Sequence, residues 1–158
     1  MKKGLGTTRA KRALIAIPGV LGLLFLGACA TMMALMHSHD VERPAESEFG
    51  FGPRQSASGL YVATIEPTET LRVRRMHRLM LTLRAADQGP AEDVSITVDG
   101  GMPEHGHGLP TQPRVTGSPG PGVYQIDGLK FNMGGWWELR FRIASATGTD
   151  SVTFNLEL

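Results

Sequence analysis

Residues 136–143 read WWELRFRI, and from Trp137 onward apolar and charged side chains alternate. Successive side chains of a β-strand point to opposite faces, so this period of two predicts a strand with one buried and one solvated face. Trp136 begins the charged face, and we expect it to be partly exposed, covered by a loop or engaged by a partner. The expected inward side chains are Trp137, Leu139, Phe141 and Ile143.

Short strand patterns also occur on both sides of this stretch. Turn-rich segments such as 85–92 and 116–122 separate them, and no stretch after residue 36 has a helical period. This succession predicts an all-β fold, an immunoglobulin-like antiparallel β-sandwich over residues 59–158. The other expected strands are 59–65, 77–84, 93–99, 123–126 and 151–158.

The composition agrees with one such domain and an accessory segment. The chain has 158 residues, of which 41% are hydrophobic and 20% charged, so it is too apolar to be disordered. Its 20 glycines and 10 prolines are too many for a helical bundle. The single cysteine, Cys29, rules out an intrachain disulfide, so the fold depends on its apolar core.

Charge is distributed unevenly along the chain. The first 12 residues carry five Lys or Arg, and the rest, with 11 basic and 15 acidic residues, has a net charge of −4. This balance argues against nucleic-acid binding. One basic cluster remains in the second part, and we favour a solvated strand edge over a binding patch for it. It consists of Arg72, Arg74, Arg75 and Arg78.

The N-terminal segment is predicted to attach the chain to a membrane. Residues 13–36 contain no charged side chain, and about 20 apolar residues suffice to span a bilayer as a helix. The preceding positive charges predict a cytoplasmic N-terminus and an extracytoplasmic domain at a bacterial cell membrane. We predict an uncleaved signal anchor; the alternative is a lipoprotein signal, because residues 26–29, LGAC, resemble a lipobox ending in Cys29.

Residues 37–58 are predicted to be a flexible linker, because they show no strand or helix period. His37, His39 and Asp40 within it can in principle bind a metal ion, but a solvated His-x-His beside a membrane is the interpretation we prefer.

One segment between strands carries candidate chemistry. Residues 102–107 read MPEHGH, and Met133 stands in a second loop just before the strand at 136. A soft thioether suits Cu(I), and imidazole binds copper or zinc, so this combination favours copper. If the two loops meet at one end of the fold, they form a copper site; otherwise they are ordinary turns with exposed or hydrogen-bonded histidines. The candidate metal ligands are Met102, His105, His107 and Met133.

The same segments resemble the YtkA-like domain family, which is similar in outline to the FixH and CopC-like extracytoplasmic proteins. The motifs that carry the resemblance are residues 102–108 (MPEHGHG), Pro113, residues 122–124 (GVY) and residues 131–136 (FNMGGW). The resemblance implies a membrane-tethered immunoglobulin-like domain connected with copper handling or oxidase assembly. It carries over the same four candidate ligands.

Enzymatic function is not expected. Ser118 and Ser145 have no identifiable catalytic partner, and a zinc site built on Glu104, His105 and His107 has no separate general base. Two hypotheses remain open. One is a copper-binding or copper-delivery domain; the other is a metal-free module that docks through its tryptophan pair on a membrane or exported complex.

Overall fold

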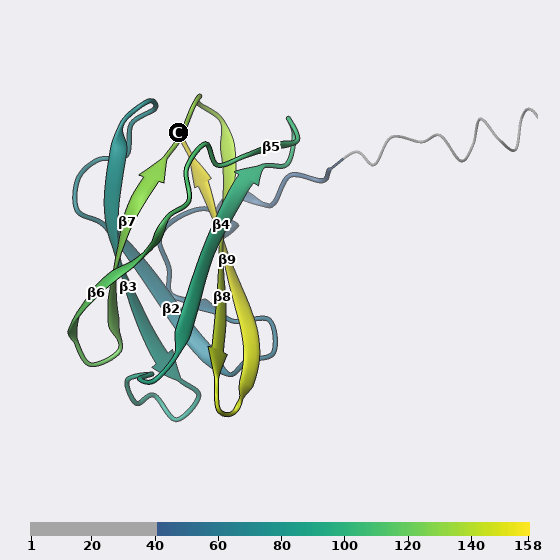
Figure 1. The fold of residues 1–158 in the computed structure, drawn as a ribbon. Coiled ribbons are helices and arrows are strands. Elements are labelled where there is room, and N and C mark those ends of the chain that lie inside the picture. The colour runs from purple at the N-terminus through teal and green to yellow at the C-terminus, as the bar shows by residue number, and fades with distance from the viewer. Residues whose placement is uncertain (1–40) are drawn as a thin grey trace, which may run out of the picture. The chain divides into compact units, whose positions relative to one another are not determined.

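The computed structural model describes residues 41–158 (Figure 1). The apolar segment 13–36, the motif at Cys29 and the residues His37, His39 and Asp40 lie outside the described residues. Within the described part, no helix is both long enough and apolar enough to span a membrane.

The described chain consists of antiparallel β-strands and one short 3-10 helix, so the predicted all-β class is confirmed. The strands follow the order β1-β2-β3-β7-β6-β4-β8-β9, and β5 pairs with β4 alone. The elements are η1 (Glu46–Glu48), β1 (Arg54–Gln55), β2 (Tyr61–Pro67), β3 (Met76–Ala85), β4 (Ser95–Met102), β5 (His107–Gly108), β6 (Arg114–Gly120), β7 (Val123–Lys130), β8 (Trp136–Ser145) and β9 (Gly148–Glu157).

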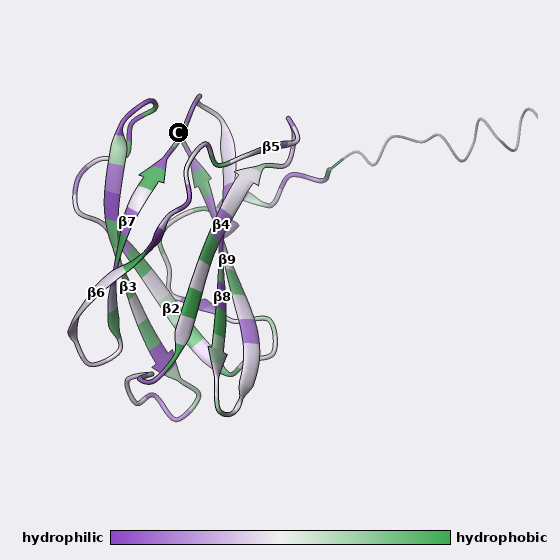
Figure 2. Ribbon diagram, in the orientation of Figure 1, coloured by the Kyte–Doolittle hydropathy of each residue, from purple (hydrophilic) through white to green (hydrophobic). Residues whose placement is uncertain are grey.

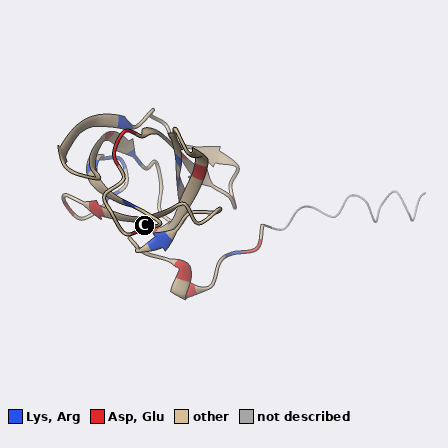
Figure 3. Cartoon of the chain, turned by 90° about the horizontal axis from the view of Figure 1, so that it is seen from below, with Lys and Arg blue, Asp and Glu red and all other residues tan. Residues whose placement is uncertain are grey.

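The strands form one continuous sheet that curls until it is nearly closed (Figure 3). β4 joins β6 only through the pair Thr97 and Arg114. On the opposite side, the edge strand β9 is approached by the start of the domain, where the Ala57 amide donates to the Ser151 carbonyl at 2.8 Å. The fold therefore resembles a barrel, whereas the sandwich that we expected has two separate sheets.

Several strand boundaries differ from the predictions, among them those of β6, β4 and β7, which extends to Lys130. β6 (Arg114–Gly120) includes most of the segment 116–122 that we expected to be a turn, because glycine and proline are tolerated at its bulged, irregular pairing with β7. β4 extends through Met102, three residues beyond the expected end of that strand.

The core lies on the inward faces of the strands, where green and pale or purple positions alternate in Figure 2. The four inward residues predicted for β8 are all fully buried, and Val152, Phe154 and Leu156 of β9 are buried beside them. Burying a side chain of this size stabilises a fold by about 1.5–3 kcal/mol. The residues of β8 concerned are Trp137, Leu139, Phe141 and Ile143.

Trp136 is buried as well, with 1% of its surface exposed. Its indole Nε1 donates to Asn155 Oδ1 at 3.0 Å, and the rings of Trp136 and Phe49 pack edge to face with centroids 6.4 Å apart. The guanidinium of Arg43 lies 5.9 Å from the centroid of the Trp136 ring. Of the three situations expected for Trp136, the structure shows coverage, by the segment that precedes β1.

The predicted linker therefore differs from the structure over its second half. Residues 43–57 pack on the sheet, and β1 pairs with β2. We placed the start of the domain at residue 59 because this segment has no period. Several of its contacts are with residues about 90 to 100 positions further along the chain, such as Ser56 with Asp150 of β9 and Phe49 with Trp136 of β8, and no local period records them.

Asp150 fastens this N-terminal segment to β9. Its buried carboxylate accepts hydrogen bonds from Ser56 Oγ (2.7 Å) and from the amides of Ser58 (2.9 Å), Leu60 (3.2 Å) and Ser151 (2.8 Å). Burial by itself would raise the pKa of this carboxyl, but the four hydrogen bonds outweigh it and lower the pKa to about 2.

Candidate functional site

The segment with candidate chemistry forms a tight hairpin at one end of the barrel. β4 ends at Met102, which pairs with His107 of β5, and the His105 amide donates to the Met102 carbonyl at 3.1 Å. Gly101 permits this close pairing, because a Cβ there would lie 2.5 Å from the His107 carbonyl oxygen. Gly106 adopts a φ of 63° in the turn, a conformation that favours glycine.

The hairpin presents its two imidazoles side by side. His105 and His107 are both exposed, and their rings are nearly parallel, with an angle of 15° between the planes and centroids 6.2 Å apart. Neither ring forms a hydrogen bond with the described part of the chain. Their nitrogens are therefore accessible to a ligand from solvent.

Met102 belongs to the core. It is 1% exposed, and its methyl carbon Cε lies 3.1 Å from the position that a Cβ on Gly135 would occupy. This contact shows that the hairpin and the loop before β8 meet. The placement gives Met102 a packing role and leaves its sulfur closed to solvent.

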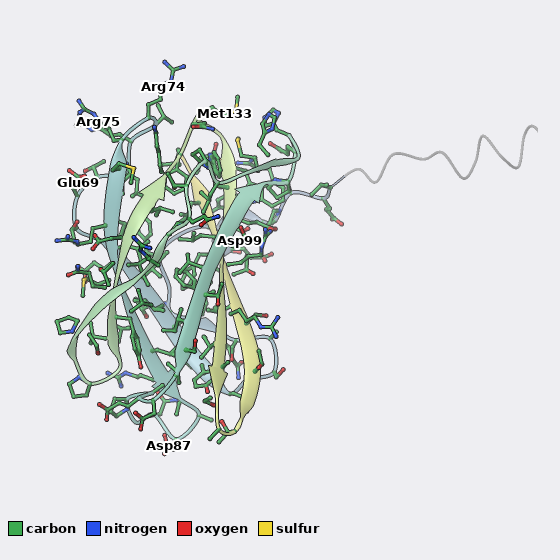
Figure 4. All side chains as sticks on the ribbon, viewed as in Figure 1. Glu69, Arg74, Arg75, Asp87, Asp99 and Met133 are labelled. Atoms are coloured by element: carbon green, nitrogen blue, oxygen red, sulfur yellow. The ribbon has the colours of Figure 1, made fainter. Side chains whose placement is uncertain are left out.

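Met133 occupies the loop that Met102 packs against, and it is 41% exposed (Figure 4). The loop is fixed by its backbone, because the Met133 carbonyl accepts a hydrogen bond from Trp137 Nε1 at 3.0 Å. Its thioether is therefore free at the same end of the barrel as the two histidines. The two predicted loops come together, with three of the four candidate ligands exposed.

Glu104 is engaged in an ion pair. Arg43 Nη1 lies 3.7 Å from its carboxylate, and Arg43 Nη2 also pairs with Glu157 at the end of β9. The hydrogen bond to Glu157, with smaller contributions from the charges of both carboxylates, raises the pKa of the Arg43 guanidinium. Within residues 41–158 no group of three or more His, Cys, Asp or Glu side chains is arranged to hold a metal ion.

A third loop lies at this end and was not singled out as part of the site. Residues 68–75 connect β2 to β3, and the Arg74 amide donates to the Phe131 carbonyl at 2.7 Å, which joins this loop to the one that carries Met133. We call the three segments 68–75, 103–107 and 131–135 together the loop end. The sequence signal that marks loop 68–75 is its run of arginines.

The expected strand-edge cluster divides in the structure. Arg78 lies on β3 and pairs with Asp127 of β7 at 2.6 Å, as a solvated cross-strand pair. Arg72, Arg74 and Arg75 precede the strand and lie in the loop. The solvated part of our interpretation therefore holds for Arg78, but the strand-edge part does not, because β3 lies between β2 and β7.

Comparison with known proteins identifies the family. A family model described as YtkA-like matches residues 56–142, which is more than half of the chain and includes the hairpin and Met133. The solved structure of a ZirS C-terminal domain aligns with 16% sequence identity and a TM-score of 0.39, covering 96% of this chain and 97% of that one. No curated protein matches the chain.

Proposed function

Because the chain belongs to the YtkA-like family, we propose that it is a membrane-tethered extracytoplasmic domain that binds or delivers copper through the loop end. In this proposal, residues 13–36 hold the chain in a bacterial cell membrane as a signal anchor; in the alternative, lipid on Cys29 holds it after the preceding signal has been removed. The domain is the nearly closed antiparallel sheet described above, whose two halves are joined by the single pair between β4 and β6.

The observation that carries the proposal is the pairing of the exposed imidazoles of His105 and His107. Metal–imidazole bonds are about 2 Å long. Two rings whose centroids are 6.2 Å apart can therefore hold one ion between a nitrogen of each, after side-chain rotations that the exposed turn permits. Linear or three-coordinate geometry of this kind suits Cu(I).

Met133 is the third ligand in this proposal. Its exposed thioether lies in the loop that packs against the hairpin, and thioethers select Cu(I) over harder ions. Met102 packs from the core side against the loop that carries Met133. Its sulfur is buried, so Met102 is not a ligand in this conformation. The partner that receives or supplies copper would be a membrane-protein complex of the oxidase-assembly type.

We propose binding rather than catalysis. The Ser118 hydroxyl donates to the Val123 carbonyl at 3.0 Å, and the Ser145 hydroxyl accepts from Tyr61 at 2.8 Å, so both are engaged in structural hydrogen bonds away from the histidines. The alternative is a metal-free interaction module. It loses its best sequence argument, because Trp136 is covered by Arg43 and Phe49.

Copper titration of the full chain in detergent tests the proposal. His37→Ala and His39→Ala are introduced throughout so that only the described domain can supply histidines. Cu(I) is titrated under reducing conditions against a chromophoric chelator, and Cu(II) separately. We expect one Cu(I) per chain, abolished by His105→Ala with His107→Ala and weakened about tenfold or more by Met133→Leu.

Met102→Leu is the matched control, since it replaces a buried thioether with an apolar side chain of similar size and should leave the affinity for Cu(I) unchanged. A far-UV spectrum verifies that each variant is folded. Binding that survives removal of both histidines contradicts the assigned site. No binding in either oxidation state leaves the interaction module as the function.

A further inference from the structure

We infer that the loop end docks on a membrane surface that contains anionic lipids, through loop 68–75 and the exposed methionines beside it. The inference rests on the tether in the proposed function, and it is independent of whether copper binds. The docking face is the part of the domain that would contact the bilayer.

Loop 68–75 carries unneutralised positive charge. None of the three guanidiniums of Arg72, Arg74 and Arg75 forms an ion pair with another described residue. The one acid of the loop, Glu69, has its carboxylate 3.3 Å from Nδ1 of His77, a side chain that is 1% exposed. Figure 4 shows Arg74 and Arg75 projecting outward from this end of the barrel, away from the remainder of the domain.

Apolar side chains lie among these cations. Within residues 41–158 five large hydrophobic side chains are exposed, and three of them belong to the loop end or border it: Val73 (39%), Met76 (55%) and Met133 (41%). Cations that alternate with exposed apolar residues are typical of surfaces that lie in the interface of an anionic membrane. A loop that contacts only water is not expected to expose these large apolar side chains.

The loop is held rigidly enough to present its arginines together. His77 Nε2 lies 2.7 Å from the carbonyl oxygen of Arg72 and 3.1 Å from its amide, and the Arg74 amide is bonded to Phe131. Arg74 itself has a φ of 63°, which turns the chain sharply between its neighbours. A preformed loop loses less conformational entropy on binding than a flexible one.

The point at which the chain enters the domain favours the same orientation. Arg43 is anchored beside Glu104 of the hairpin and Glu157 at the end of β9, so the chain joins the domain at the loop end. Six residues lie between Arg43 and the end of the predicted anchor at residue 36, so the two ends of this stretch are at most about 25 Å apart. If the anchor ends at the membrane surface, as the proposed function has it, the entry point of the chain at the loop end cannot lie farther than this from the bilayer.

The experiment measures the depth of two sites in proteoliposomes that contain the full chain. An environment-sensitive fluorophore is attached at Val73→Cys, or at Asp87→Cys as the matched control. Cys29 is kept because the lipoprotein alternative depends on it, and the chain without an added cysteine measures the signal of any label at Cys29. Asp87 lies in the turn at the opposite end of the barrel (Figure 4). Quenching by nitroxide-labelled lipid is compared in phosphatidylcholine vesicles with and without phosphatidylglycerol.

We expect the label at residue 73 to be quenched severalfold more strongly than the label at residue 87 when phosphatidylglycerol is present. The difference should shrink in high salt, because salt screens attraction between exposed charges. It should disappear when Arg72, Arg74 and Arg75 are all replaced by Gln. This variant removes charge from exposed positions and leaves the core contacts of the fold in place.

Equal quenching at the two positions, or quenching that the three Gln substitutions do not change, overturns the inference. Flotation of the same vesicles is measured first and separates two kinds of failure. A chain that does not float with the vesicles contradicts the tether and the docking together. If the chain floats with the vesicles but neither label is quenched by the lipid, only the docking is contradicted. The copper proposal is then unaffected.

Discussion

At the residue scale, two buried polar groups of this domain are satisfied by partners that lie well separated from them in the sequence. Asp150 accepts from Ser56 and from backbone amides of the first turn of the domain, and Trp136 donates to Asn155. An unsatisfied buried donor or acceptor costs about 1–3 kcal/mol, so each of these side chains requires its partner in place. The polar residues thereby specify which segments pair.

Replacing Asp150 with Asn is expected to destabilise the domain by about 2 kcal/mol at neutral pH. The folded-state pKa of about 2 lies below the ordinary value of 3.8, so the carboxylate stabilises the fold above about pH 4. This contribution is lost as the pH falls from 4 toward 2. Urea unfolding of both proteins across this range measures the difference, which should be largest at neutral pH.

Asp127→Asn is the control for this prediction. The pKa of Asp127 is also lowered to about 2, first by its hydrogen bond from Arg78, but that pair is exposed on the outside of the sheet. Because solvent screens such pairs, its substitution should cost less than that of Asp150. A stability difference for Asp150→Asn that is the same at pH 7 and pH 2 would contradict the role assigned to the carboxylate.

Gly101→Ala is expected to separate the two strands of the hairpin. The added Cβ would lie 2.5 Å from the His107 carbonyl oxygen, so β5 must move, at a cost of about 1–3 kcal/mol. Gly108→Ala is the matched control, because the nearest atom to its Cβ is 3.8 Å away. Thermal unfolding should distinguish the two variants, and equal midpoints would show that the hairpin tolerates the contact.

At the scale of elements, the segment 43–49 acts as a cover for the outer face of β8. Arg43 contacts both aromatic rings, at 4.9 Å from the Phe49 centroid and 5.9 Å from that of Trp136, and it pairs with the carboxylates of the hairpin and of β9. One side chain thus links the cover, the hairpin and the last strand. The cover holds the entry point of the chain at the loop end.

Removing the cover should expose Trp136. The double variant Arg43→Ala, Phe49→Ala is expected to shift the tryptophan emission to longer wavelength and to lower stability by about 1–2 kcal/mol, from loss of the ring contact and the cation–π contact. Trp136→Phe in the same background identifies the responding residue, because Trp137 stays in the core. Unchanged emission would mean that the tryptophan is shielded by other groups.

At the scale of the whole molecule, local sequence patterns predicted most of the long strands but did not predict how the sheet closes on itself. The alternation in residues 77–84 and 136–143 predicts β3 and β8 to within two residues, because burial of one face imposes that period. β6 was missed because its glycines and proline resemble a turn. Coverage of Trp136 was one of three expectations, but the covering segment was not predictable, because no local pattern records a contact with a segment 87 positions earlier.

The candidate site, like the fold, was predictable from the sequence only in part. The residue types in 102–107 and at 133 indicate soft-metal chemistry, and the two loops do meet. A thioether, however, serves equally well as an apolar core side chain, so composition alone could not place Met102 inside and Met133 outside. That distinction depends on Gly135, which leaves room for the Met102 methyl group.

The fastening of the first segment to β9 has a consequence for the order of assembly. Asn155, Ser151 and Asp150, which hold residues 49–60, are synthesised about 100 positions later than the residues they hold. The start of the domain can therefore make these contacts only after β9 has been translated. Contacts between such distant positions form slowly, so the nascent domain remains open along this seam for longer than anywhere else. Chaperones that protect it during biogenesis would find their target there.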